Sequence, residues 1–191
     1  MAQQKILMCP PDYYGVAYEI NPWMKVSNQP NKTLARLQWQ TMKQTLEQTG
    51  LLVVLMPPVP GLPDLVFTAN GGLRYYGGVI LSNFKYPERQ KEIIHFVNFF
   101  VFQKYACGWL PPGIFFEGEG DALFCGEKLV CGYGMRSDKR GITTVAKIIG
   151  KEPILLKLID PYFYHLDTCF CYPKKDLVLC HLPAFNKSSR E

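Results

Sequence analysis

Several features that would narrow the function at once are missing from this 191-residue chain. It has no stretch of about 18 uninterrupted apolar residues, which a membrane-spanning helix needs, so we expect no membrane span. Its net charge of +5 comes from scattered lysines rather than a long basic run, so nothing favours a nucleic-acid partner. Residues 1–5 carry no apolar segment of the signal-peptide kind, and we therefore expect a cytoplasmic protein.

The seven cysteines also lack the spacing of a disulfide framework, which favours a reducing compartment and thiols that act as small apolar groups. Two pairs, Cys169 with Cys171 and Cys180 with His181, raise the alternative of a zinc site. However, the Cys-x-Cys alternation fits one face of a strand, and no Cys-x-x-Cys pair follows. We therefore expect no metal and no cofactor.

The composition is that of an ordinary globular protein, with 48% hydrophobic and 19% charged residues, and the length suits one domain spanning residues 1–191. Three segments read as hairpins about 50 residues apart. The first is expected to start with a strand near Leu65 and to turn at Gly77-Gly78. A polar residue opens each hairpin at a similar place, so these residues should point toward the same end of the structure. The hairpins lie in residues 65–81, 120–131 and 166–179, and their opening residues are Asn70, Asp121 and Asp167.

Helical patterns lie between the hairpins, and each is followed by a short apolar stretch that reads as a strand. The expected helices span residues 33–49, 87 to about 105, and 139–149; the expected strands span residues 51–56, 109–110 and 154–159. A unit of strand, strand, helix and strand that recurs at about 50 residues predicts an α/β protein with a radial or stacked repeat architecture.

His165 is the first candidate for chemistry, because Asp167 lies two residues after it at the mouth of a hairpin. Acids that converge on a His can hold a cationic, planar substrate and move protons on it. The alternative is a strand-end His that only pairs with a neighbouring acid.

An acidic, glycine-rich segment from Glu117 to Asp121 lies about 45 residues earlier, and Arg136 follows the second hairpin. The repeat would bring this segment to the same end as His165. Two alternatives remain open: the acids belong to a tight turn and face water, and Arg136 is a surface residue paired with Asp138. Otherwise Arg136 could bind a carboxylate through both arms of its guanidinium.

Three segments resemble the guanidino-group-modifying enzymes, a superfamily that includes arginine deiminases, dimethylarginine hydrolases, amidinotransferases and arginine dihydrolases. They are LPDLVF at residues 62–67, FEGEGD at 116–121 and HLDT at 165–168. The resemblance spans essentially the whole chain. It implies the pentein fold, a five-bladed α/β propeller of ββαβ units, of which this length would hold between three and four blades.

The resemblance also implies roles for individual residues. His165 would be the proton shuttle and Glu117 its acidic partner. Asp167 and Asp64 would bind guanidino nitrogens, and Arg136 would hold the α-carboxylate of an arginine-like substrate. In this family a Cys thiolate attacks the guanidino carbon, and the His protonates the departing amine and later activates water.

One departure points to a branch of the superfamily. Dimethylarginine hydrolases and arginine deiminases carry acidic residues where this chain has Ala69-Asn70. The arginine dihydrolase branch has Asn in this setting, and its N-terminal stretch resembles residues 10–24 here. Asn70 and Asn21 are then expected to face the substrate as amides.

A second departure concerns the nucleophile. The family's catalytic Cys lies roughly a hundred residues beyond the His, and no residue of this chain corresponds to it. We therefore expect a hydrolase of arginine or a related compound represented without its C-terminal part, with an inactive relic or guanidino-binding module as the alternative. A homo-oligomer is possible, and loss of the thiolate should remove covalent catalysis almost entirely.

Overall fold

The computed structural model describes residues 4–191 and divides into two compact units, one ending at Thr68 and one from Ala69 to Glu191. In the first unit, β1 (Lys5–Met8) and β2 (Leu52–Leu55) pair in parallel, and α1 (Lys32–Gln48) connects them. The side chain of Asn31 caps α1 by accepting a hydrogen bond from the backbone N–H of Leu34. The helix ends before Gly50, as predicted, but it buries none of its residues.

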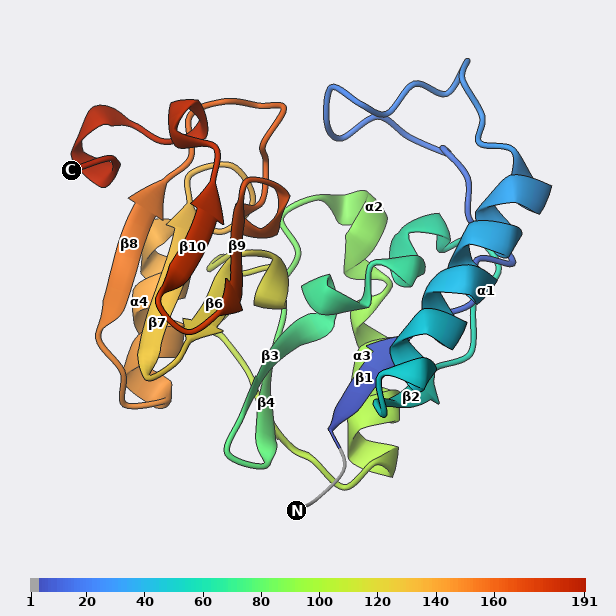
Figure 1. Cartoon of the computed structure of the whole chain (residues 1–191), viewed down its shortest axis with the longest axis horizontal. Helices are drawn as coiled ribbons and strands as arrows, with labels where there is room; N and C mark the ends of the chain where they lie inside the picture. The colour runs from blue at the N-terminus through green and yellow to red at the C-terminus, as the bar shows by residue number, and fades with distance from the viewer. Residues whose placement is uncertain (1–3) are drawn as a thin grey trace. The chain divides into compact units, whose positions relative to one another are not determined.

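The second unit contains two complete ββαβ repeats (Figure 1). In each repeat a hairpin is followed by helix and then by a strand that pairs in parallel with the second hairpin strand, so the helix forms the crossover connection that parallel strands need. The first repeat consists of β3 (Gly72–Tyr75), β4 (Gly78–Leu81), α2 (Pro87–Gln90), α3 (Ile93–Phe102) and β5 (Ala106–Gly108). The second consists of β6 (Ala122–Cys125), β7 (Lys128–Tyr133), α4 (Lys139–Ile148) and β8 (Pro153–Lys157).

A third hairpin, β9 (Phe170–Lys174) with β10 (Leu177–Cys180), follows. A short 3₁₀ helix precedes each of the three hairpins: η2 (Thr68–Gly71), η3 (Gly118–Gly120) and η4 (Leu166–Thr168). The remaining 3₁₀ helices are η1 (Pro63–Val66), η5 (Leu182–Ala184) and η6 (Lys187–Ser189). The predicted α/β class and the recurring unit are therefore confirmed. Within residues 4–191, each helix is too short or too polar to cross a bilayer.

The sheets of the second unit stack on one another through two apolar cores. Alternate residues of β7 point to opposite faces: Leu129 and Cys131 enter a core shared with the first repeat and α4, whereas Val130 enters a core shared with β9. Since both faces of β7 are covered, this strand packs against the first repeat on one face and against the third hairpin on the other.

Four local predictions need correction. Residues before the first hairpin form η1 and η2 rather than a strand, and the turn lies at Tyr76-Gly77, where both residues have positive φ. The helix expected from Pro87 divides into α2 and α3, because the N–H of Glu92 bonds to the carbonyl of Arg89 in a tighter turn. The strand expected at residues 109–110 is β5, three residues earlier. The small side chains of β5 gave no hydrophobic pattern that would predict a strand. Prolines at 111 and 112 lack the backbone N–H that further strand pairing would need.

Candidate active site

His165 lies between two buried carboxylates at the mouth of the third hairpin. Its Nδ1 is 3.2 Å from Oδ2 of Asp121, and its Nε2 is 3.3 Å from Oε2 of Glu117. All three side chains are almost fully buried. Neither contact has the angle of a full hydrogen bond, so the ring is held mainly by charge attraction. The structure thus brings the predicted pair His165 and Glu117 together and adds a second acid.

The glycine-rich segment places these acids inside the protein. Gly118 has a φ of +61°, and a Cβ there would lie 2.6 Å from the carbonyl oxygen of Ala69. A Cβ on Gly120 would collide with Nδ2 of Asn70 and lie 3.2 Å from Nδ1 of His165. Both glycines are therefore required for close approach. The alternative of a turn whose acids face water is wrong for Glu117 and for Asp121.

Arg136 joins the cluster through Glu117. Its Nη1 is 3.1 Å from Oε2 of Glu117, and its guanidinium lies between the rings of Tyr86 and Tyr164, at 4.8 and 4.7 Å from their centroids. The alternative of a surface Arg paired with Asp138 is wrong, because Arg136 is buried.

Asp138 has a different task, since its carboxylate caps α4 at Gly141 and accepts a hydrogen bond from the N–H of Phe115.

A hydroxyl that the sequence did not single out connects the two acids. Ser137 donates its Oγ–H to Oδ2 of Asp121 at 2.7 Å and accepts the backbone N–H of Glu117 at 2.9 Å. Oδ1 of Asp121 accepts the N–H of Leu166, the residue after His165, at 3.1 Å. The position of Ser137 beside Arg136 was the only signal in the sequence for its role.

Asn70 is held by a buried ion pair that the sequence analysis also missed. Arg89 contacts Glu92 through two N–H groups at 2.9 Å each, and its Nη1 donates to Oδ1 of Asn70 at 2.9 Å. Since Oδ1 is occupied by Arg89, the Nδ2 donor of Asn70 points toward Gly120, on the side of His165. An Arg and a Glu three residues apart at a helix start were the available signal.

The charges in this cluster shift one another's pKa values. Burial raises the pKa of Glu117, but His165, Arg136 and Arg89 offset this and lower it to about 2. Burial lowers the pKa of His165, but Asp121 and Glu117 together raise it to about 9. At neutral pH the ring is therefore an imidazolium between two carboxylates.

The thiols near the cluster are not activated. Burial, with the charges of Asp167 and Asp121, raises the pKa of Cys169 to about 12, and burial with Asp121 raises that of Cys131 to about 12. Cys169 directs its sulfur to the carbonyls of His165 and Leu166. Both groups are neutral thiols at physiological pH and are poor nucleophiles.

The remaining predicted residues differ in setting. Asp167 is exposed on η4, and its pKa is raised. Partial desolvation and the charge of Asp121 raise it by more than the charge of His165 lowers it. Asp64 and Asn21 belong to the first unit. Asp64 is buried in η1, and its charge contributes to a raised pKa of Tyr14. Oδ1 of Asn21 accepts the N–H groups of residues 23 and 24, so its carbonyl is used locally. Their roles stay predictions.

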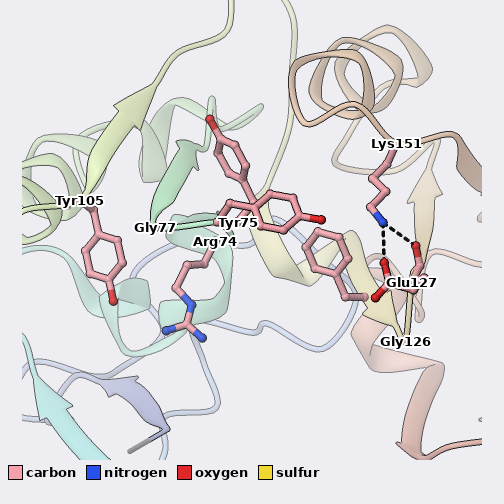
Figure 2. A pocket seen from close by; sticks show the side chains of 9 residues that line it. Arg74, Tyr75, Gly77, Tyr105, Gly126, Glu127 and Lys151 are labelled. Carbon is pink, nitrogen blue, oxygen red and sulfur yellow. Dashed lines mark hydrogen bonds and ion pairs between the residues drawn. The ribbon is translucent and has the colours of Figure 1, made fainter. Parts of the chain in front are cut away.

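A hollow of about 420 Å³ lies elsewhere in the second unit, at the turn ends of its first two hairpins (Figure 2). Tyr75 and Tyr105 line it, and Lys151 pairs there with the carboxylate and the backbone carbonyl of Glu127 at 2.9 and 3.0 Å. No predicted site residue lines this hollow, because the acid–histidine cluster lies at the opposite ends of the same hairpins. In residues 4–191, no group of three or more His, Cys, Asp or Glu residues could hold a metal ion.

Comparisons with known proteins identify the family of this chain. The model of the eukaryotic N,N dimethylarginine dimethylhydrolase family matches residues 17–191. The chain is 43% identical over 188 residues to ArgZ of Synechocystis sp., a bifunctional arginine dihydrolase/ornithine cyclodeaminase, covering 97% of this chain and 26% of ArgZ. It is 35% identical over 190 residues to the dimethylarginine dimethylaminohydrolase of Mycobacterium tuberculosis, covering 98% of this chain and 62% of that enzyme. The chain thus spans less than two thirds of either relative.

Solved structures show the same fold. The N-terminal domain of ArgZ, a cyanobacterial arginine dihydrolase, was crystallised with substrate as a cysteine-to-serine mutant. It matches with a TM-score of 0.92 and 42% identity, covering 97% of this chain and 69% of that chain. A dimethylarginine dimethylaminohydrolase adduct, 18% identical, has a TM-score of 0.74 and covers 94% of this chain and 69% of that chain. The chain belongs to the dimethylarginine dimethylhydrolase family of guanidino-group-modifying enzymes.

Proposed function

We propose that this chain forms the substrate-gripping and acid–base part of a hydrolase that cleaves a C–N bond in the guanidino group of arginine or a related compound. The observation that carries the proposal is the buried ring of His165, whose two nitrogens lie 3.2 and 3.3 Å from the carboxylates of Asp121 and Glu117. Similarity to arginine dihydrolases and to a dimethylarginine hydrolase supports the substrate class.

The substrate is a planar cation, and binding it requires fixed carboxylates and hydrogen-bond acceptors. The contact at 3.1 Å between Glu117 and the guanidinium of Arg136 shows that this carboxylate already accepts such a group. In the proposal, Asp167 and Asp64 bind guanidino nitrogens, Asn70 and Asn21 contribute amides, and Arg136 binds the α-carboxylate. This set is taken over from the family resemblance.

His165 supplies the proton chemistry. A guanidinium carbon is a poor electrophile, and its C–N bond breaks only when the departing nitrogen receives a proton. An imidazolium that persists at neutral pH can donate that proton, and the resulting imidazole can then take a proton from water. The raised pKa of His165, about 9, supports this order of events.

The attacking thiolate is the part that these residues do not provide. Cys169 and Cys131 have raised pKa values, and the family's nucleophile lies far beyond His165 in sequence. This observation favours the second candidate for the chain taken by itself, a module that binds guanidino compounds without turnover. We expect the 191-residue chain to bind arginine and to release neither ornithine nor citrulline.

The test is a thermal melt with arginine at millimolar concentration, because a ligand at 100 times its Kd stabilises by about 2.7 kcal/mol. Lysine, which keeps the α-amino acid group but lacks the guanidinium, is the matched ligand control, and dimethylarginine tests substrate preference. Glu117→Gln should abolish the shift, whereas Glu127→Gln, a change at an exposed ion pair, should preserve it.

Equal shifts with arginine and lysine, or none with either, would contradict a guanidino site. Release of ammonia by the chain alone would contradict the expectation that it binds arginine without turnover. A single cooperative melt would support the single domain over residues 1–191, and light scattering on the same sample tests for a homo-oligomer.

A further inference from the structure

Asp121 is the fully buried acid for which the proposed mechanism above gives no task of its own. Its two oxygens are divided between two parts of the molecule. Oδ1 accepts the backbone N–H of Leu166 at 3.1 Å, and Oδ2 lies 3.2 Å from Nδ1 of His165. One carboxylate therefore contacts both the ring of His165 and the backbone next to it.

Ser137 fixes this carboxylate from the other side. Its Oγ–H and its backbone N–H both donate to Oδ2 of Asp121, at 2.7 and 3.2 Å. The same Oγ accepts the N–H of Glu117, so the two acids that flank His165 are tied to one hydroxyl. Because Ser137 is itself buried just before α4, the carboxylates of Glu117 and Asp121 have little freedom to move around His165.

We propose that Asp121, held by Ser137, is the positioning residue that orients the ring of His165 and keeps it in its charged, proton-donating form. Without this carboxylate, Nδ1 of His165 would lose the acid that lies 3.2 Å from it, and Glu117 at Nε2 would be the remaining ion-pair partner of the ring. The catalytic consequence rests on the proposed function, whereas the orienting role rests on the contacts alone.

The charges that face His165 from each neighbouring element agree with this assignment. Glu117 lies ahead of η3, Arg136 follows β7 and neutralises part of the charge on Glu117, and Asp167 lies on η4, which begins directly after His165. Burial lowers the pKa of His165, and the charge of Asp121 is the largest of the influences that raise it. Removing the charge of Asp121 should therefore lower the pKa of His165 more than any other single substitution among its neighbours.

The experiment is an NMR titration of the histidine side chains in the full chain, with the three histidines labelled and the His165 signal assigned from its absence in a His165→Gln variant. The wild-type ring should titrate near pH 9. In Asp121→Asn, which is nearly isosteric, the midpoint should fall by about one unit or more. The matched control is Asp138→Asn, an Asp-to-Asn change seventeen residues on that keeps the cap of α4 and does not contact His165.

A second variant separates charge from packing. Ser137→Ala removes the hydroxyl donor from Oδ2 of Asp121, whereas the backbone N–H of residue 137 still holds the carboxylate. The carboxylate should then attract the His165 proton more strongly, and the His165 midpoint should rise. An unchanged or lower midpoint in Ser137→Ala, or an unchanged midpoint in Asp121→Asn, would overturn the inference. If Asp121→Asn does not fold, the direction of the Ser137→Ala shift decides.

Arginine added to the same samples distinguishes this inference from the proposed function. If the wild-type chain does not bind arginine but Asp121→Asn lowers the His165 midpoint, the proposed function fails and the orienting role stands. If the chain binds arginine but Asp121→Asn leaves the His165 midpoint unchanged, the orienting role fails and the proposed function stands.

Discussion

Glu92→Gln should destabilise the protein far more than the loss of one surface charge would. The carboxylate of Glu92 is fully buried and accepts two N–H groups of Arg89, whose guanidinium also lies 4.6 Å from the centroid of the Phe84 ring. The same guanidinium donates to Asn70. Substitution by Gln keeps the shape and one acceptor oxygen, but it removes the negative charge that Glu92 presents to the buried cation of Arg89.

Breaking one side of a buried ion pair costs about 3–5 kcal/mol, because the remaining charge has lost the solvation of water and gained nothing in return. The oxygen that Gln retains places Glu92→Gln near the lower end, about 3 kcal/mol. For a chain of this size, about 2–4 °C of Tm accompanies each kcal/mol, so the Tm should fall by roughly 6–12 °C. Urea unfolding followed by circular dichroism measures the free energy directly.

Two controls isolate the cause. Glu47→Gln breaks the half-exposed pair of Glu47 with Lys43 on α1 and should cost no more than about 0.5 kcal/mol. The double variant R89M/E92L replaces both charges by apolar groups of similar size and should cost less than E92Q alone. A loss below about 1 kcal/mol in E92Q, or a double variant less stable than E92Q alone, would refute the argument that removing one charge of this buried pair costs more than removing both.

Three further predictions concern the cluster around His165. The pKa of His165 is raised from 6.5 to about 9, so the ion pairs of the charged ring stabilise the fold fully below pH 6.5, and this stabilisation is lost as the pH rises through 9. Urea unfolding across this range should therefore show the largest difference in free energy of unfolding between wild type and His165→Gln at the acidic end. Gly120→Ala should abolish binding of arginine in the thermal melt, because the new methyl group collides with the site, whereas Gly108→Ala has ordinary contact distances and should bind normally. Cys169 should react with iodoacetamide at pH 8 much more slowly than the exposed Cys171, and peptide mapping that finds equal rates would contradict its raised pKa.

The repeat was predictable because hairpins and helices have different hydrophobic periods. Turn residues and a 3.6-residue pattern located α1 and α4 to within about one residue at most ends. Elements without such a pattern were missed. β5 consists of Ala, Cys and Gly, and it forms only because β4 offers it a parallel partner. The division between α2 and α3 lies at a tighter backbone turn, in which the N–H of Glu92 bonds to the carbonyl of Arg89, and the hydrophobic pattern of the segment does not reveal it.

The site was predictable where a residue type has few other uses. An imidazole beside an acid and an acidic glycine-rich segment pointed to His165 and Glu117. Asp121 was noticed as a hairpin opener and as the end of the acidic segment but was given no role, and Ser137 was not singled out for the site, because their contacts depend on how the hairpin mouths meet. Such contacts join residues 16 to 45 positions apart, so no local sequence signal specifies them.

The charge balance of the second unit argues that its interior serves more than stability. Six ionisable groups are almost completely buried, and they pair as three acids and three bases: Glu92, Glu117 and Asp121 with Arg89, Arg136 and His165. Taking each ion out of water costs several kcal/mol, and apolar side chains of the same volume often stabilise a fold better. A chain that only had to fold would gain by replacing them. The proposed function accounts for them. Groups that hold a guanidinium and keep a proton on an imidazole must be paired and shielded from water before the substrate binds, because an electrostatic site acts most strongly where water is excluded and its dipoles need not reorganise. The glycines at positions 118 and 120 belong to the same requirement, because any side chain there would separate the acids from the ring.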